Sequence, residues 1–357
     1  MSLTPRLSSS ECRPKVLMTR PWPEARELLQ EHFDVEYWKD EDFGTMKKSK
    51  MIELMKGKFG LLCGAIHKID EDIINAGVTI LFVSYKTSSN AASCQFYRVG
   101  LDNIDMKALK RNKVRLGNCP GVNTEATAEL TVALLLATSR RLRELSNFAR
   151  TQSGLIIIAN ATLGGSYAPS LPPNWRCKGL DGSTVGIVGY GSIGNSVARK
   201  LKTFSVKQIL YTSRQEKVSG TEIGAVRTDL ETLLRSSDFV IITMALTPET
   251  RGFIGRDQIG QMKKTAIIVN TSRGGLIDQE ALIEALEERR ILAAGLDVTE
   301  PEPLPIDHPL LKLDNCEISG HSASMTVKAR NDLERYAAQN IIAVLKELPM
   351  PGEFPLL

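Results

Sequence analysis

Three polar side chains with complementary chemistry each follow a short apolar run in the second half of the chain. They are Arg273, Glu302 and His321, and the apolar runs before them cover residues 266–270, 293–298 and 317–319. Short runs of this kind are typical of buried strands in a parallel sheet, and ligands bind at the carboxyl edge of such sheets. The sequence therefore predicts that the three side chains lie at one sheet edge.

The three side chains together match what the reduction of a 2-keto acid requires. Arg273 can hold a carboxylate through two parallel hydrogen bonds and polarise the adjacent ketone. His321 is suited to give a proton to the new alkoxide near neutral pH, and a carboxylate beside it, Glu302, favours the charged imidazole and orients it. No metal and no nucleophile is required. Each residue also has an ordinary alternative, since a single His is often structural and Glu302 can be a solvated charge beside Glu300.

A glycine-rich loop between a strand-like and a helix-like segment indicates a dinucleotide site. The loop reads Gly189-Tyr190-Gly191-Ser192-Ile193-Gly194. Gly189 allows a tight turn, Gly191 lets the backbone approach a pyrophosphate, and Gly194 permits close packing of helix on strand. The alternative is a glycine-rich turn without a ligand, but the flanking pattern favours the dinucleotide.

The end of the next strand predicts which nicotinamide cofactor binds. NAD sites usually place a carboxylate there for the ribose 2′-hydroxyl. This chain has Ser213, Arg214 and Gln215, with no carboxylate until Glu216. Arg214, with Ser213 and possible added charge from Lys217, suits a 2′-phosphate. We therefore expect NADPH to be preferred, with NADH possible, although Arg214 can also be a plain solvated loop residue.

Strand-like and helix-like patterns alternate along the chain and predict the strands and helices that position these residues. The length of 357 residues favours two domains. Residues 126–145 predict one long helix between the domains, with Arg140, Arg141 and Arg143 near its end. A last helix is expected from residue 327 to about 348, packed back on the first domain. The expected domains are residues 15–122 plus 326–357 for substrate, and 123–325 for the cofactor.

Composition excludes several other classes. The net charge of +4 is spread along the chain without a basic block, which argues against binding of nucleic acid or a membrane surface. No apolar stretch approaches the length of a membrane span, and the N-terminus lacks a secretory signal, although a weak organelle address stays open. The six cysteines form no CxxC pair, which indicates a reducing compartment and a cytoplasmic location.

These residues carry a family resemblance that covers nearly the whole chain after residue 14. The chain resembles the D-2-hydroxyacid dehydrogenases, and within them the glyoxylate/hydroxypyruvate reductase group. The matching stretches include Gly60-Leu61-Leu62-Cys63, Thr127-Ala128-Glu129-Leu130, Asn270-Thr271-Ser272-Arg273-Gly274, Gly295-Leu296-Asp297-Val298-Thr299 and His308-Pro309-Leu310-Leu311. The resemblance implies reduction of hydroxypyruvate to D-glycerate and of glyoxylate to glycolate by a homodimer. It also implies two doubly wound parallel-sheet α/β domains, one flavodoxin-like and one of Rossmann type, with a cleft between them.

The resemblance also implies further site residues. It places Val99, Gly100, Asp297 and Ser324 at the substrate together with Arg273 and His321. It assigns the cofactor to Gly189, Gly191, Ser192, Ile193, Gly194, Ser213, Arg214, Gln215, Ala245, Thr271, Asp297 and Ala323.

Departures from the family pattern leave a second hypothesis open. Insertions at about residues 86–98 and 154–172 interrupt segments that the family uses near the substrate and the partner subunit. Ser322-Ala323-Ser324 modestly alters the run after the histidine, and Gly320 replaces a proline. The insertions favour a catalytically weak nucleotide-binding scaffold, whereas the intact Arg273, Glu302 and His321 favour an active reductase. A third interpretation keeps the enzyme class and changes the substrate, for instance to phosphoglycerate or a bulkier keto acid.

Overall fold

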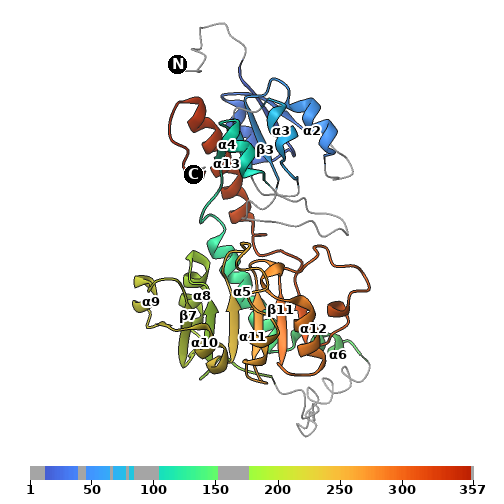
Figure 1. Ribbon diagram of the computed structural model, residues 1–357, viewed down its shortest axis with the longest axis vertical. Helices are drawn as coiled ribbons and strands as arrows, with labels where there is room; N and C mark the ends of the chain where they lie inside the picture. The colour runs from blue at the N-terminus through green and yellow to red at the C-terminus, as the bar shows by residue number, and fades with distance from the viewer. Residues whose placement is uncertain are drawn as a thin grey trace, which may run out of the picture. The chain divides into compact units, whose positions relative to one another are not determined.

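The computed structural model describes residues 13–38, 46–64, 67–77, 80–83, 104–151 and 177–354. The chain forms two compact units: unit 1 comprises Met1–Asn123 and Ser324–Leu357, and unit 2 comprises Thr124–Ala323. Both ends of the chain thus belong to unit 1, where the red C-terminal helix packs beside the blue N-terminal strands (Figure 1). Both expected insertions, with Val99 and Gly100, lie outside the described residues.

Unit 1 is built on a six-stranded sheet in the order β13-β5-β4-β3-β1-β2. The strands are β1 (Lys15–Met18), β2 (Asp34–Tyr37), β3 (Gly60–Cys63), β4 (Ile80–Val83), β5 (Arg115–Gly117) and β13 (Glu353–Phe354). The first five strands pair in parallel, as the alternation of strand-like and helix-like patterns predicts. Only β13 runs antiparallel, beside β5, and its two residues are too short to show a sequence period.

Helices cover both faces of this sheet. They are α1 (Pro23–Gln30), α2 (Lys48–Met55), α3 (Glu71–Asn75), α4 (Met106–Arg111) and α13 (Val327–Leu345). Side chains alternate along β1, so Leu17 packs with the α2, α3 and α4 cluster, while Val16 and Met18 pack with α1 and α13. The last helix therefore packs within unit 1, as its isolated position in the sequence predicts.

Unit 2 is built on a seven-stranded parallel sheet in the order β12-β11-β10-β9-β6-β7-β8. The strands are β6 (Thr184–Val188), β7 (Gln208–Thr212), β8 (Val226–Arg227), β9 (Phe239–Ile242), β10 (Ile267–Asn270), β11 (Ala293–Leu296) and β12 (Cys316–Ile318). The chain first moves outward from β6 through β7 to β8 and then returns to β9 on the other side. Such a reversal of strand order creates a ligand crevice at the carboxyl ends of the strands.

The faces of this second sheet are also covered by helices (Figure 1). They are α5 (Thr124–Ser139), α6 (Leu142–Ala149), α8 (Ser192–Lys202), α9 (Val218–Thr221), α10 (Leu230–Ser236), α11 (Arg256–Gly260) and α12 (Gln279–Glu287), with the 3-10 turns η2 (Gly274–Leu276) and η3 (Pro309–Leu311). Along β9, Phe239 and Ile241 join the cluster under α5 and α8, whereas Val240 and Ile242 join the cluster under α10, α11 and α12. Burial on both faces explains why these strands read as unbroken apolar runs.

The prediction of one long helix over residues 126–145 is wrong. Helix α5 ends at Ser139, α6 begins at Leu142, and Arg141 between them is left-handed with φ of 53°. The Arg143 guanidinium donates to the carbonyls of Leu313 and Cys316, both at 2.9 Å, and so anchors α6 to the residues around β12. These contacts span about 170 residues of chain, so the local apolar period does not reveal the break.

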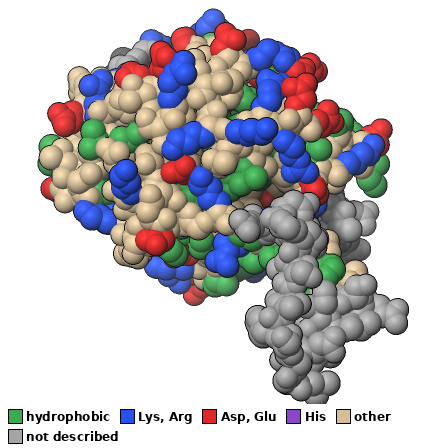
Figure 2. All heavy atoms as spheres, turned by 90° about the horizontal axis from the view of Figure 1, so that it is seen from below, with side chains coloured by type: hydrophobic (Ala, Val, Ile, Leu, Met, Phe, Trp, Pro, Cys, Tyr) green, Lys and Arg blue, Asp and Glu red, His purple; other side chains and the backbone are tan. Residues whose placement is uncertain are grey.

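Surface charge in unit 2 is mixed. Lys and Arg side chains spread over the face seen in Figure 2, with Asp and Glu among them. Exposed pairs such as Arg256–Glu284 and Arg235–Glu231 account for some of these charges, and water screens such pairs strongly. In the part of the chain that the structure describes, no helix has both the length and the apolar character needed to cross a bilayer.

Candidate active site at the carboxyl edge of the unit 2 sheet

A buried imidazole–carboxylate pair lies just beyond β11 and β12. Nδ1 of His321 lies 3.1 Å from Oε2 of Glu302, and the two side chains are 8% and 4% exposed. Oε1 of Glu302 accepts a hydrogen bond from the Thr299 N–H at 3.0 Å, which fixes the carboxylate. Because a carboxylate only accepts, Nδ1 carries the proton in this pair, and proton exchange with a ligand falls to Nε2.

The loop that carries His321 is shaped by Asp297, a carboxylate that is 1% exposed at the end of β11. The three nearest donors to this carboxylate are Ser319 Oγ at 2.7 Å, the Ser322 N–H at 2.7 Å and the Ala323 N–H at 3.1 Å. The backbone at Gly320 and His321 is left-handed, with φ of 64° and 55°. A conformation that is uncommon for His is held in place by a satisfied buried charge. Asp297 thus positions the loop of His321, and its expected contact with cofactor and substrate stays a prediction.

The turn that presents Arg273 is built by the fully buried Asn270 at the end of β10. Its side chain accepts from the Ser272 N–H at 3.0 Å and donates to the Arg273 carbonyl at 2.8 Å. A Cβ on Gly274 would lie 2.1 Å from the carbonyl oxygen of Thr299. The turn after β10 therefore packs directly on the loop after β11, and only glycine permits that approach.

The strand register brings the three loops to one edge. Asn270, Leu296 and Ile318 are aligned across the neighbouring strands β10, β11 and β12. Strands are ~4.8 Å apart, so the loops of Arg273 and His321 begin roughly 10 Å apart. The Arg273 guanidinium donates from Nη1 to the Ser272 carbonyl at 2.8 Å. The structure thus places Arg273, Glu302 and His321 in neighbouring loops at one sheet edge.

The glycine loop follows β6 and leads into α8. A Cβ on Gly189 would lie 2.6 Å from the Met244 side chain, and one on Gly194 would lie 2.6 Å from the Gly189 carbonyl. Gly189 also has φ of 88°, which favours glycine. The Gly189 N–H donates to Thr212 Oγ1 at 3.2 Å, which ties this loop to the end of β7. Tight packing therefore requires glycine at two of the three positions.

Gly191 is different, because a Cβ there would have no neighbour within 4 Å. Packing does not require glycine at this exposed position, at the N-terminus of α8 beside Ser192 and Ile193. A backbone free of side chains, next to the N–H groups of the first helical turn, suits the approach of a pyrophosphate. The residues present therefore fit a dinucleotide.

Other expected cofactor residues lie at the same carboxyl edge. Ala245 follows β9, and its carbonyl accepts from Thr250 Oγ1 at 2.9 Å. Thr271 follows β10, and its hydroxyl lies 2.7 Å from that of Thr131 in α5. Since the Thr131 hydroxyl donates to the Thr127 carbonyl, Thr271 must donate to Thr131 and keeps only acceptor capacity for a ligand.

The loop after β7 holds Ser213, Arg214 and Gln215, where the 2′-phosphate is expected. Arg214 and Gln215 are exposed. Arg227 on β8 donates from Nε to the Ser213 carbonyl at 3.0 Å and from Nη2 to the Arg214 carbonyl at 3.3 Å. Arg227 was not predicted from the sequence, because its contacts join β8 to the loop after β7, 13 and 14 residues earlier, and no local motif marks them.

Three substrate residues were expected outside this edge, and the structure does not test them. Ser324 is the first residue of the second segment of unit 1, and Val99 and Gly100 lie outside the described residues. Their roles stay predictions. His67 in unit 1 is buried, and burial, partly offset by a hydrogen bond to the Gly64 carbonyl, lowers its pKa to about 4. It is therefore neutral near pH 7, unlike a proton-donating imidazolium.

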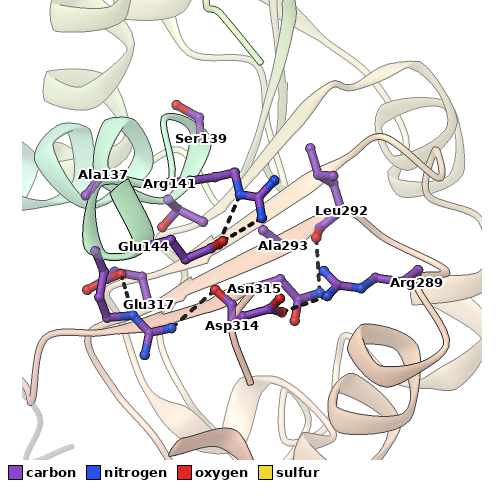
Figure 3. Close-up of a pocket in the computed structure, with 12 residues that line it drawn as sticks. Ala137, Ser139, Arg141, Glu144, Arg289, Leu292, Ala293, Asp314, Asn315 and Glu317 are labelled. Carbon is purple, nitrogen blue, oxygen red and sulfur yellow. Dashed lines mark hydrogen bonds and ion pairs between the residues drawn. The ribbon is translucent and has the colours of Figure 1, made fainter. Parts of the chain in front are cut away.

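A cavity of about 320 Å³ lies at the opposite edge of the sheet. Figure 3 shows its lining, in which Arg141 pairs with Glu144 and Arg289 pairs with Asp314 at 2.7 Å. Asp314 and Asn315 precede β12, so the cavity is at the amino edge, away from Arg273 and His321. Its arginines are already engaged by carboxylates, and it supplies no group for the chemistry considered above.

The chain is similar to a family of oxidoreductases along most of its length. Residues 132–323 match the family model described as D-isomer specific 2-hydroxyacid dehydrogenase, NAD binding domain. The chain is 40% identical over 347 residues to the glyoxylate reductase/hydroxypyruvate reductase of Mus musculus, which covers 96% of this chain and 98% of that protein.

Two solved structures extend the similarity to the fold. A protein of Thermus thermophilus is 34% identical, with a TM-score of 0.81 and coverage of 96% of this chain and 100% of that chain. An NADPH-dependent glyoxylate/hydroxypyruvate reductase of Sinorhizobium meliloti, solved with NADP and malonate, is 25% identical with a TM-score of 0.74. It covers 96% of this chain and 97% of that chain.

Proposed function

The chain belongs to the D-isomer specific 2-hydroxyacid dehydrogenase family of NAD(P)-dependent oxidoreductases, and from this premise we propose that it reduces hydroxypyruvate to D-glycerate and glyoxylate to glycolate with NADPH. The observation that carries the proposal is the buried Glu302–His321 pair at the sheet edge that also presents Arg273. The mouse relative, named for both activities, supports the choice of substrates.

In the proposed mechanism the side chains act on the keto acid. Arg273 binds the carboxylate and polarises the ketone oxygen through charge-assisted hydrogen bonds. When bound, the reduced nicotinamide supplies the hydride for the carbonyl carbon. As negative charge develops on the carbonyl oxygen, His321 gives it a proton, and the oxygen becomes the product hydroxyl. Glu302, 3.1 Å from the ring, holds the imidazole in one orientation and compensates its charge.

The cofactor preference rests on the residues after β7. No carboxylate occupies positions 213–215, and Arg214 is exposed at the place where a ribose 2′-phosphate is expected. The NADP-bound reductase of Sinorhizobium meliloti supports the same preference. A ratio of kcat/KM for NADPH over NADH well above one is the expected result, and a ratio below one would remove the preference.

The decisive experiment is a substrate panel with both cofactors. Purified protein is mixed with hydroxypyruvate, glyoxylate, pyruvate and bulkier keto acids while nicotinamide absorbance is followed. The highest kcat/KM is expected for the two small acids. Cofactor binding without turnover of any keto acid would support the scaffold alternative, which no feature of the described site favours. A different best substrate would keep the enzyme class and change only the side-chain pocket.

The remaining proposals concern assembly and location. Unit 1 binds substrate through Val99, Gly100 and Ser324, unit 2 binds the cofactor, and two chains form a homodimer in the cytoplasm. Sedimentation equilibrium of the purified chain measures the mass directly, and a monomer at micromolar concentration would contradict the dimer.

A further inference from the structure

Arg227 is the one arginine of the short edge strand β8, and its side chain reaches the loop where the cofactor ribose is expected. The register pairs Arg227 with Tyr211 of β7. From there the guanidinium extends to the two carbonyls that follow, those of Ser213 at 3.0 Å and Arg214 at 3.3 Å. Arg227 therefore holds the first two residues of the loop.

The far end of the same loop is held by Tyr211. Its hydroxyl accepts from the Lys217 N–H at 3.0 Å. A Cβ on Gly220 would lie 2.9 Å from the Tyr211 ring, so α9 packs closely on that ring. Residues 213–217 are thus anchored at both ends, while Arg214 to Lys217 are all exposed.

The charge of Arg227 is not neutralised by a carboxylate. In the described part of the chain no Asp or Glu is within ion-pair distance of it. A guanidinium has five N–H donors, and the two carbonyls use two of them. With Arg214 and Lys217 the loop brings together three cations and one carboxylate of its own, Glu216, while Asp229, two residues after Arg227, is engaged as the cap of α10 by the Thr232 N–H. This local excess of positive charge matches a phosphate dianion.

We propose that Arg227 is a second specificity-determining residue for the cofactor 2′-phosphate, acting beside Arg214. It would fix the backbone that presents Ser213 and Arg214 and add its own charge to the phosphate site. The inference rests on the proposed use of NADPH. A neutral side chain could hold the two carbonyls, but it would not select a dianion over a hydroxyl.

Two nucleotides without nicotinamide separate recognition from catalysis. Adenosine 2′,5′-bisphosphate and 5′-AMP differ only in the 2′-phosphate, and calorimetry on the full chain gives a Kd for each. Arg227→Gln is expected to weaken binding of the bisphosphate about tenfold or more and to leave 5′-AMP within about twofold. Arg227→Lys, which keeps the charge but not the paired donors, is expected to fall between. The matched control is Arg235→Gln, at an exposed arginine of α10 paired with Glu231, and it should change neither Kd.

The outcomes distinguish the proposed role of Arg227 from the proposed preference for NADPH. Equal weakening of both nucleotides by Arg227→Gln would show that Arg227 only shapes the loop, and no change would show that it does nothing there; either result overturns the inference. If the unmodified chain binds both nucleotides equally, the NADPH preference itself fails. Thermal melting of each variant confirms that the protein is folded, and Arg227→Lys keeps the test informative if Arg227→Gln is unstable.

Discussion

Two regions at the carboxyl edge of the same sheet are built in different ways. In the loops after β10, β11 and β12, Asn270, Asp297 and His321 are all buried; Asn270 binds within its own turn, and Asp297 and His321 are each bound by a neighbouring loop. In the loop after β7, Arg214 and Gln215 are exposed, and the contacts that tie the loop to the rest of the unit lie at its two ends. Proton transfer requires fixed, desolvated groups, whereas recognition of a phosphate tolerates water. The difference in burial between the two regions therefore agrees with their proposed functions, proton transfer in one and phosphate recognition in the other.

The largest effect is expected when the buried region loses its proposed proton donor. His321→Gln keeps a polar side chain of similar length but cannot deliver a proton near pH 7. We expect kcat to fall about 10²–10⁴-fold while the Kd for NADPH stays within about twofold. Stopped-flow turnover and fluorescence titration measure the two quantities. His32→Gln in unit 1 serves as the control, and retention of most activity by His321→Gln would exclude it from the mechanism.

A second test compares two glycines, one from a packed turn and one from an open loop. Gly274→Ala places a Cβ 2.1 Å from the Thr299 carbonyl, a backbone atom that cannot move alone. We expect the free energy of unfolding to fall by about 1–3 kcal/mol and kcat to fall as well, since the Arg273 turn and the Glu302 loop separate. Denaturant unfolding measures the change. An unfolding midpoint equal to that of the unmodified protein would show that the two loops are not locked together.

The matched variant is Gly191→Ala, where a Cβ would meet nothing within 4 Å. We expect stability to change by less than about 0.5 kcal/mol, because no packing is disturbed. Binding of NADPH is expected to weaken about tenfold, because the methyl group occupies the approach of the pyrophosphate. A stable variant with unchanged NADPH affinity would place the pyrophosphate elsewhere.

Residues that act through local geometry were predictable from sequence. The three glycines of the 189–194 loop and the strand ends before Arg273, Glu302 and His321 follow from short-range patterns. The break at Arg141 and the partners Arg227 and Gln279 were not predictable, because their bonds join residues 13 to about 170 positions apart. Asn270 had a weak signal, as asparagine directly after a strand favours turns.

Substitution of Gln279 tests whether hydrogen bonds to Glu300 also help to hold the loop of Glu302. Its side chain donates to the Glu300 carbonyl at 2.6 Å and accepts from the Glu300 N–H at 3.0 Å, two residues before Glu302. Gln279→Leu removes both bonds, and we expect kcat to fall about 3–10-fold with the KM for NADPH unchanged.

Two further variants complete that test. Gln279→Glu keeps the acceptor for the Glu300 N–H and loses the donor, so an intermediate kcat is expected. Glu280→Gln, at the exposed neighbouring position, should leave kcat unchanged. If Gln279→Leu has the same kcat as the unmodified protein, the bonds from Gln279 are not needed to hold the loop of Glu302. The contacts of Thr299 and Asp297 would then be sufficient.

The smallest expected effect separates the two regions without any substitution. Screening reaches exposed charges, with a Debye length of about 10 Å at 0.1 M salt, and acts much less on buried pairs. Raising the salt concentration from about 0.05 to 0.5 M should therefore raise the KM for NADPH a few-fold, and the KM for NADH less, because the exposed arginine loop meets only the 2′-phosphate. The value of kcat should stay constant, since Glu302 and His321 are 4% and 8% exposed. A fall in kcat that parallels the rise in KM would mean that solvent and salt reach the imidazole–carboxylate pair. The proposed difference between a buried catalytic pair and an exposed cofactor loop would then be wrong.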